Sequence, residues 1–201
     1  MATDAIPLQP GARSGRRLTG CSASVQATLM SRAAPSTSPK ILGAPRDGAL
    51  LILCLLLTYA AEGVGAIASI HAAAFYASLA QPRWAPPPWL FGPVWTLLYT
   101  LMAVALWRVV RSAQAHATAT AVFLVQLVIN ALWSWLFFRW HLGAVSFGWI
   151  VLLLAMIAAT LGAFWRISRI AAILLLPYLG WVLFATLLSW TLWRANPAAL
   201  G

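Results

Sequence analysis

The residues best suited to chemistry lie in one stretch, residues 81–99, which reads Gln-Pro-Arg-Trp-Ala-Pro-Pro-Pro-Trp-Leu-Phe-Gly-Pro-Val-Trp-Thr-Leu-Leu-Tyr. It joins a proline-rich loop to a long apolar segment through three tryptophans. Pro86, Pro87 and Pro88 fix three φ angles, so a stiff backbone carries the aromatic rings. Flat rings on a stiff support suit the binding of a large planar apolar ligand, which they can stack on or grip at its edge.

This chain has few residues that could act as general acids or bases. It holds 3 acidic residues, and two of them, Asp4 and Asp47, lie in or near the N-terminal region. Paired-carboxylate catalysis and carboxylate metal sites are therefore excluded. The third acid, Glu62, lies within a long apolar segment, where an ionisable group is costly and by default marks a functional site. The alternative is a carboxyl that reaches the membrane interface or lies protonated against a neighbouring helix.

Amides and indoles are the other polar groups of the apolar segments. Gln126 and Asn130 are four residues apart, and Trp133 continues the same helical face. In lipid such amides turn inward, either as hydrogen bonds between helices or as ligand contacts. Several of the 12 tryptophans lie near segment ends, as in an interfacial belt, but Trp95 and Trp181 lie deeper. These deeper rings favour a binding site inside the bundle.

Composition assigns the chain to the membrane proteins. Of its 201 residues, 62% are hydrophobic and 8% are charged, which is too apolar for a soluble globule. A helix that crosses a bilayer needs roughly 20 apolar residues, and five segments reach that length. We therefore predict an all-α membrane protein, a compact bundle of five transmembrane helices. The predicted helices are Ala49–Ile70, Trp89–Val110, Thr118–Phe138, Ala144–Trp165 and Ile170–Trp193.

Pro177 lies inside the fifth predicted helix. Proline lacks the N–H that would bond to the carbonyl one turn earlier, so the helix can kink at this point. A kink makes room for a cavity. A proline tolerated for packing is an equally weighted alternative.

The formal charge of +10 is distributed as in a membrane protein, not as in a nucleic-acid-binding protein. Most basic residues precede the first predicted helix or lie in the second and fourth loops, as Arg108 and Arg169 do. By the positive-inside rule, the N-terminus and these loops lie inside. Residues 1–48 are rich in Ser, Ala, Pro and Arg and are predicted to be a disordered tail, either an over-long start or a transit segment. Residues 49–201 form the five-helix domain.

Four sequence blocks occur together in one known family. They are Pro-Arg-Trp-Ala-Pro-Pro-Pro-Trp-Leu-Phe-Gly-Pro-Val-Trp-Thr-Leu-Leu-Tyr at 82–99, Gln-Leu-Val-Ile-Asn-Ala-Leu-Trp-Ser-Trp-Leu-Phe-Phe at 126–138, Ala-Phe-Trp-Arg-Ile-Ser-Arg at 163–169, and Pro-Tyr-Leu-Gly-Trp-Val-Leu-Phe-Ala-Thr-Leu-Leu-Ser-Trp at 177–190 with Trp-Arg-Ala-Asn at 193–196. With these blocks the chain resembles the translocator protein family, also called tryptophan-rich sensory protein (TspO) or peripheral-type benzodiazepine receptor. The resemblance implies a bundle of five transmembrane helices, commonly dimeric, whose pocket is closed on one side by the first loop.

The resemblance also implies a ligand and a set of site residues. Family members bind porphyrins such as protoporphyrin IX, so a porphyrin is the expected ligand and no cofactor is required. Trp95 and Trp181 match tryptophans that flank the porphyrin in bacterial relatives, and Asn130 matches an amide able to hydrogen-bond a ligand carbonyl. The implied pocket residues are Phe91, Gly92, Val94, Trp95, Asn130, Trp133, Trp181, Ala185 and Leu188, and the implied lid contains Trp84, Pro86, Pro87 and Pro88.

Three functions remain open at this point. The first is a tetrapyrrole-binding membrane protein that acts as a sensor, regulator or carrier. The second is light- or oxygen-dependent porphyrin breakdown, attributed to some relatives, in which Trp95 and Trp181 would be the reacting residues. The third is a membrane scaffold whose aromatic residues serve only packing and anchoring. Trp190 stands where the weak cholesterol pattern of the family has tyrosine, which counts against steroid transport.

The expected partners are membrane lipid, a porphyrin or another planar apolar small molecule, and a second copy of the chain. Nucleic acid is not expected. Ala117 and Ala121 form a small-xxx-small step that allows two helices to approach closely. The predicted location is a multi-pass position in a bacterial cell membrane, with an outer or organellar membrane as the alternative.

Overall fold

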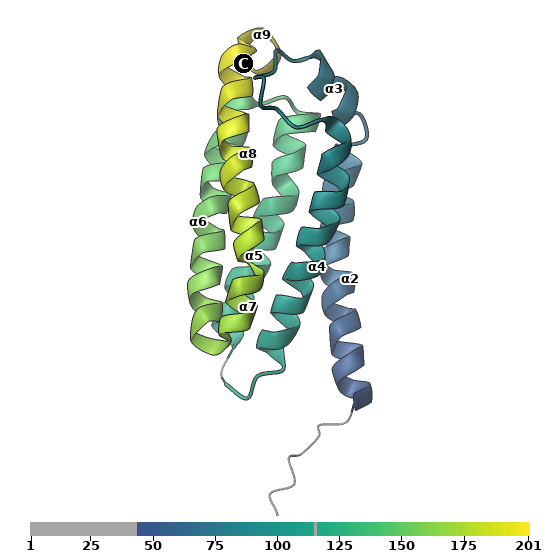
Figure 1. Ribbon diagram of the computed structural model, residues 1–201, viewed down its shortest axis with the longest axis vertical. Coiled ribbons are helices and arrows are strands. Elements are labelled where there is room, and N and C mark those ends of the chain that lie inside the picture. The colour runs from purple at the N-terminus through teal and green to yellow at the C-terminus, as the bar shows by residue number, and fades with distance from the viewer. Residues whose placement is uncertain (1–43, 115) are drawn as a thin grey trace, which may run out of the picture. The chain divides into compact units, whose positions relative to one another are not determined.

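The computed structural model describes residues 44–114 and 116–201 (Figure 1). The prediction of a disordered tail therefore lies outside the described residues for positions 1–43. The first described helix, α2 (Ala44–Ala68), begins at Ala44 and not at the predicted Ala49. Asp47 lies in its first turn, where the positive end of the helix dipole stabilises a carboxylate. Residues 44–48 are thus helical and do not belong to the tail.

Five helical segments of the described chain are long and apolar enough to cross a membrane, as predicted. Their bounds differ from the predicted ones by no more than three residues. The spans are Arg46–Ala68 in α2, Pro88–Val110 (the 3-10 turn η1, Pro88–Leu90, and α4, Phe91–Val110), Ala117–Arg139 (α5, Ala117–Ser134, and the π-helical turn η2, Trp135–Arg139), Gly143–Ile167 (α6), and Arg169–Ala195 (α7, Arg169–Leu174, and α8, Leu176–Ala195).

The spans pack side by side as a closed ring. α2 packs against α4 and α5, α4 packs against α7, and α6 packs against α5 and α8. Because α7 and α8 form one span, the order around the ring is first, second, fifth, fourth and third. The first span thus lies between the second and the third, and all five enclose one interior (Figure 1).

Large apolar side chains fill the centre of the ring and also cover its outside. Phe123, Ile157 and Phe164 are completely buried at the centre. On the outside, Leu56 is 63% exposed and Leu187 is 65% exposed. A surface this apolar is stable in hydrocarbon and not in water, so the outer face of the bundle is a lipid-facing surface.

Gln126 ties two spans together in the interior. Its Nε2 donates to the hydroxyl oxygen of Tyr178 on α8 at 2.7 Å, and both side chains are fully buried. A buried amide in lipid needs such a partner, since no water can reach it. Of the two interpretations of the amides, helix-to-helix hydrogen bonding therefore holds for Gln126.

The fifth span is broken just before Pro177, which agrees with the first of the two interpretations of this proline. α7 ends at Leu174 and α8 begins at Leu176, with Leu175 between them. Pro177 lies in the first turn of α8, where a missing N–H leaves no hydrogen bond unmade. α7 packs on both α4 and α6, whereas α8 packs mainly on α6.

The first loop meets the C-terminus at one end of the bundle. The loop contains the short helix α3 (Ala72–Ser78), and a last short helix, α9 (Pro197–Leu200), follows α8 (Figure 1). Asn196 joins the two, because its Oδ1 accepts from the backbone N–H of Ala80 at 2.7 Å and its Nδ2 donates to the Ala80 carbonyl at 3.1 Å. At Gly143 a Cβ would lie 2.4 Å from the ring of Trp193, so only glycine fits there.

Candidate functional site

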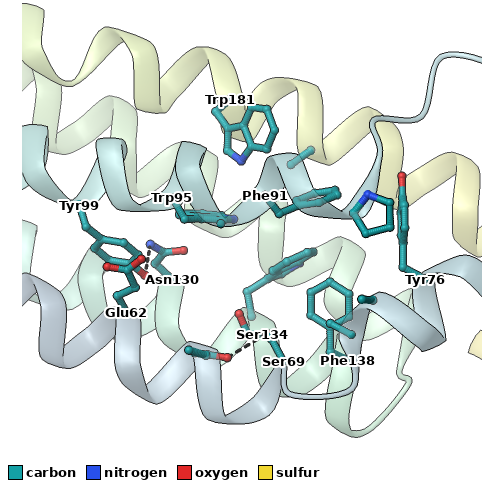
Figure 2. A pocket seen from close by; sticks show the side chains of 18 residues that line it. Glu62, Ser69, Tyr76, Phe91, Trp95, Tyr99, Asn130, Ser134, Phe138 and Trp181 are labelled. Atoms are coloured by element: carbon teal, nitrogen blue, oxygen red, sulfur yellow. Dashed lines mark hydrogen bonds between the residues drawn. The ribbon is translucent and has the colours of Figure 1, made fainter.

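A cavity of about 300 Å³ lies inside the ring, at the end that carries the first loop (Figure 2). Its volume is at the lower end of the roughly 300–1,000 Å³ of ligand pockets. Side chains from α2, α3, α4, α5, η2 and α8 line it, so all spans except the fourth contribute. The order of the ring explains this, because α6 lies behind α5 and α8.

Aromatic rings form two walls of the cavity. Phe91, Trp95 and Tyr99 follow one another at four-residue steps along α4, which places all three rings on the same face of the helix. Trp181 reaches in from α8, and its ring meets Phe91 edge to face at 5.9 Å. Trp133 reaches in from α5 and is oriented by its Nε1, which donates to the Ser146 carbonyl on α6 at 3.2 Å. Flat surfaces therefore face the cavity from three helices.

Small side chains of α2 and α3 form a third wall. Gly65 and Ala66 lie in the last turn of α2, Ser69 follows the end of the helix, and all three line the cavity. Gly65 also lets α2 approach α5 closely, since a Cβ there would lie 3.3 Å from Ser134 Oγ. Ala66 and Gly92 line the cavity and are exposed at the surface, so the cavity has an open side between α2 and α4.

Polar groups gather at the end of the cavity farthest from the loop. Asn130 Nδ2 donates to the hydroxyl oxygen of Tyr99 at 3.1 Å. Thr96 donates from Oγ1 to Glu62 Oε1 at 3.2 Å. Figure 2 shows Glu62, Tyr99 and Asn130 together at this end, with Trp95 and Phe91 between them and the loop. The cavity thus has one polar end and aromatic walls.

The indole of Trp181 has a free hydrogen-bond donor. Its Nε1 is buried and has no hydrogen-bond partner among the described residues. Figure 2 shows this nitrogen on the side of the ring that faces Trp95 and Phe91. A buried N–H without a partner costs about 1–3 kcal/mol, so Trp181 carries an unsatisfied donor beside the cavity that it lines.

A hydrogen bond within the first loop fixes Tyr76 at the cavity. The Tyr76 side chain lines the cavity and its hydroxyl donates to the Pro86 carbonyl at 3.1 Å. Burial raises the pKa of Tyr76 above its ordinary value of 10, which keeps the hydroxyl protonated as the donor. Phe75 of α3 stacks on His141 with ring centroids 4.0 Å apart and does not line the cavity.

The cavity brings together many of the residues expected from the resemblance, but not all. Leu188 lines a smaller adjoining cavity of about 20 Å³ and not the main one. Val94 packs against the hydrophobic core, and Trp84 lies 49% exposed with its ring against Phe184 at 5.7 Å. Pro86 holds Tyr76, while Pro87 is exposed. The expected residues that line the main cavity are Phe91, Gly92, Trp95, Asn130, Trp133, Trp181, Ala185 and the lid residue Pro88.

Sequence reasoning missed most of the contribution of α2, α3 and η2. Gly65 and Ser69 are four residues apart, and Ala72 follows three residues later, a spacing of small residues that allows close helix contact. This signal was present in the sequence but is common in an alanine-rich chain. Phe138 lines the cavity from η2, where the wider π-helical turn changes which side chains face inward.

These features define a class of protein: a membrane protein of five helices with an aromatic cavity under a tethered first loop. The model of the TspO/MBR family matches residues 50–194, which is most of the chain. The chain therefore belongs to the TspO/MBR family. Together with the five apolar spans, this makes it an integral, multi-pass membrane protein.

Named relatives come from bacteria and from mammals. The chain is 38% identical over 151 residues to the tryptophan-rich protein TspO of Chlorobaculum tepidum, an alignment that covers 73% of this chain and 96% of that protein. It is 37% identical over 127 residues to the protein CrtK of Rhodobacter capsulatus, covering 62% and 79%. It is 36% identical over 130 residues to the human translocator protein, covering 61% and 75%.

Proposed function

We propose that this protein binds a tetrapyrrole such as protoporphyrin IX in the main cavity and acts as a sensor, regulator or carrier of it. The observation that carries the proposal is the arrangement of Phe91, Trp95, Trp133 and Trp181, which face one space from three helices. Aromatic rings hold a flat apolar ligand by offset stacking and edge-to-face contact. The resemblance to porphyrin-binding relatives supports the same ligand.

The cavity could hold part of a tetrapyrrole, with the rest of the ligand outside the ring of helices. At about 300 Å³ the cavity is small for a ligand of this size. Its open side, where Ala66 and Gly92 are exposed, lets one edge of a flat ring extend between α2 and α4. The ligand would then be held by its inserted edge and face.

Each side chain has a role in this arrangement. The rings of Trp95 and Trp181 contact the face or edge of the ligand and exclude lipid. Trp181 Nε1 donates to a ligand acceptor, since it has no partner among the described residues. Asn130, whose Nδ2 is bonded to Tyr99, keeps its amide oxygen for a ligand donor. Tyr76 and the first loop close the end of the cavity.

The proposal is tested by titrating the detergent-solubilised protein with protoporphyrin IX in the dark and following tryptophan fluorescence. The test variant is Trp95→Phe/Trp181→Phe. The matched control is Trp89→Phe/Trp165→Phe, which changes two indoles that are 71% and 47% exposed. Since aromatic contacts contribute about 0.5–1.5 kcal/mol each, we expect saturable quenching whose Kd rises about tenfold in the test variant alone. Quenching that does not saturate, or that is equal in both variants, contradicts the proposal and favours a scaffold.

The same titration separates binding from porphyrin breakdown. Under illumination in air, a protein that only binds the porphyrin gives no faster loss of its absorbance than detergent without protein does. Loss of absorbance only in the light, and only with Trp95 and Trp181 present, supports the enzyme-like alternative.

A further inference from the structure

Glu62 lies in the wall of the cavity. It is six residues before the end of α2 at Ala68, or about 9 Å along the helix axis. Its side chain lines the cavity, and Thr96 on α4 donates to its Oε1 at 3.2 Å. The carboxyl thus turns towards α4 and the cavity, which favours the interpretation of a carboxyl that lies against a neighbouring helix in a functional site.

Glu62 has no positive partner within the described chain. The ion pair that the described residues form joins Arg111 to Asp47 at 3.4 Å, at the opposite end of α2. No basic side chain of residues 44–114 or 116–201 lies within ion-pair distance of Glu62. The neutral groups that share its end of the cavity are Tyr99 and Asn130, which bond to each other. Glu62 therefore has acceptor capacity that the single hydroxyl of Thr96 does not use.

A carboxyl in this setting selects what it can bind. An intramembrane acid faces a bundle interior or cavity and pairs with a cation or a donor. Aromatic rings beside it, here Trp95 and Tyr99, also attract a positive group through their faces. The same carboxyl repels an acidic group. The polar end of the cavity thus favours donors and disfavours acids.

We infer that Glu62 is a specificity-determining residue, and that the polar end of the cavity binds the positively charged or N–H-bearing group of a planar aromatic ligand. This inference rests on the proposed function, because it needs the aromatic walls to bind the ring of the same ligand. It specifies the orientation of the bound ligand. The cationic or N–H group lies at Glu62, and any acidic group lies towards the first loop or the open side.

The test compares two probes with the same three-ring skeleton. Near neutral pH, 9-aminoacridine is a cation with N–H donors, whereas acridine is neutral. Both are titrated into the purified full-length protein in a nonionic detergent, and tryptophan quenching gives the two Kd values. A charge-assisted hydrogen bond contributes enough to make the wild-type protein bind 9-aminoacridine about tenfold more tightly than acridine.

Glu62→Gln removes the charge and keeps the size, so the ratio of the two Kd values is expected to fall to about one. Asp47→Asn is the matched control, because it removes the same charge outside the cavity and is expected to keep the tenfold ratio. Thr96→Val is a second variant, in which the carboxyl loses its hydroxyl donor and the ratio is expected to rise.

The outcomes separate the two proposals. A ratio that stays the same in wild type and Glu62→Gln overturns the inference, as does a ratio of about one in the wild type while acridine still binds saturably. In both cases the proposed aromatic pocket stands. If neither acridine nor protoporphyrin IX quenches the wild-type tryptophans saturably, the pocket itself is wrong and both proposals fall.

Discussion

Asn130 on α5 donates a hydrogen bond from Nδ2 to the hydroxyl oxygen of Tyr99 on α4, 3.1 Å away, and both residues line the cavity. α4 and α5 are consecutive in the chain but are separated in the ring by α2. The hydrogen bond therefore spans the interior of the bundle behind the cavity. It both fixes the two helices and sets the orientation of the Asn130 amide towards a ligand.

Tyr99→Phe and Asn130→Leu separate these two roles. Tyr99→Phe removes the hydrogen bond but keeps the amide, so it lowers stability by about 0.6 kcal/mol, the typical value between membrane helices, and keeps ligand affinity within about threefold. Asn130→Leu also removes the ligand contact and is expected to raise the Kd for protoporphyrin IX about fivefold. Thermal unfolding in detergent and fluorescence titration measure both. Equal effects of the two variants on Kd would assign Asn130 to structure alone.

Tyr76→Phe is expected to loosen the first loop. It removes the hydroxyl that donates to the Pro86 carbonyl, and a hydrogen bond of about 1 kcal/mol corresponds to a dissociation rate of protoporphyrin IX about fivefold faster. Stopped-flow dilution measures this rate, with Tyr59→Phe as the matched control because Tyr59 bonds to Thr100 and does not line the cavity. An unchanged rate in Tyr76→Phe contradicts the role of this hydrogen bond.

The same hydroxyl predicts a pH dependence. Because burial raises the pKa of Tyr76 above 10 in the folded protein, its neutral form is favoured by folding. The stabilisation is fully present below about pH 10 and is lost as the pH rises through the raised pKa. The dissociation rate is therefore expected to be constant from neutral pH to about pH 10 and to increase above it in the wild type. A similar alkaline increase in Tyr76→Phe would assign the effect to another group.

Asn196 is expected to protect the first loop from cleavage. Its side chain makes both hydrogen bonds to Ala80 and a third to the Leu192 carbonyl at 2.9 Å. Asn196→Ala removes all three, so trypsin is expected to cleave after the exposed Arg83 at least several-fold faster. Asn196→Asp keeps the acceptor for the Ala80 N–H and is expected to show a smaller increase. Mass spectrometry of the digest identifies the site, and equal cleavage in all three proteins would contradict the tether.

Dimer formation remains a prediction with a defined surface. Ala117, Ala121, Val125 and Val128 lie exposed at helical spacing along α5. If a second copy packs on this face, Ala121→Trp blocks close approach and is expected to weaken the dimer more than tenfold. Ala155→Trp, on the exposed face of α6, is the matched control. Light scattering of the purified protein in detergent gives the oligomeric state, and a dimer that persists in Ala121→Trp contradicts this interface.

The membrane spans could be predicted to within a few residues because bilayer thickness sets their length and apolar composition marks them. A kink at Pro177 was one of two equally weighted interpretations, because a proline cannot make the helical hydrogen bond but can also be tolerated for packing. The order of the helices around the ring could not be predicted. Nothing in the local pattern of α2 shows that it lies between α4 and α5, since hydrophobic residues cover all sides of every span.

The candidate site was predictable where aromatic residues repeat at helical spacing, as at Phe91, Trp95 and Tyr99. The part of the site that small side chains form was harder to predict. Gly65 and Ala66 line the cavity because their small size leaves volume unfilled. No residue pattern in the sequence marks such an unfilled volume. Glu62 was noticed as costly, but its place in the cavity depends on the packing of α2 against α4, which only the three-dimensional arrangement gives.

The central claim is that a tetrapyrrole binds inside the cavity, and induced circular dichroism of protoporphyrin IX tests it most directly. The free porphyrin is achiral, so a Soret signal arises only when the protein holds it in a fixed, asymmetric site. Gly92→Leu places a side chain at the open side of the cavity, because the glycine lines the cavity, is exposed there and would carry a Cβ with no atom within 4 Å. Gly148→Leu on α6, with equally open surroundings, is the matched control. The account predicts a saturable signal in the wild type and Gly148→Leu and its loss in Gly92→Leu; a signal of equal size in all three proteins would place the porphyrin elsewhere.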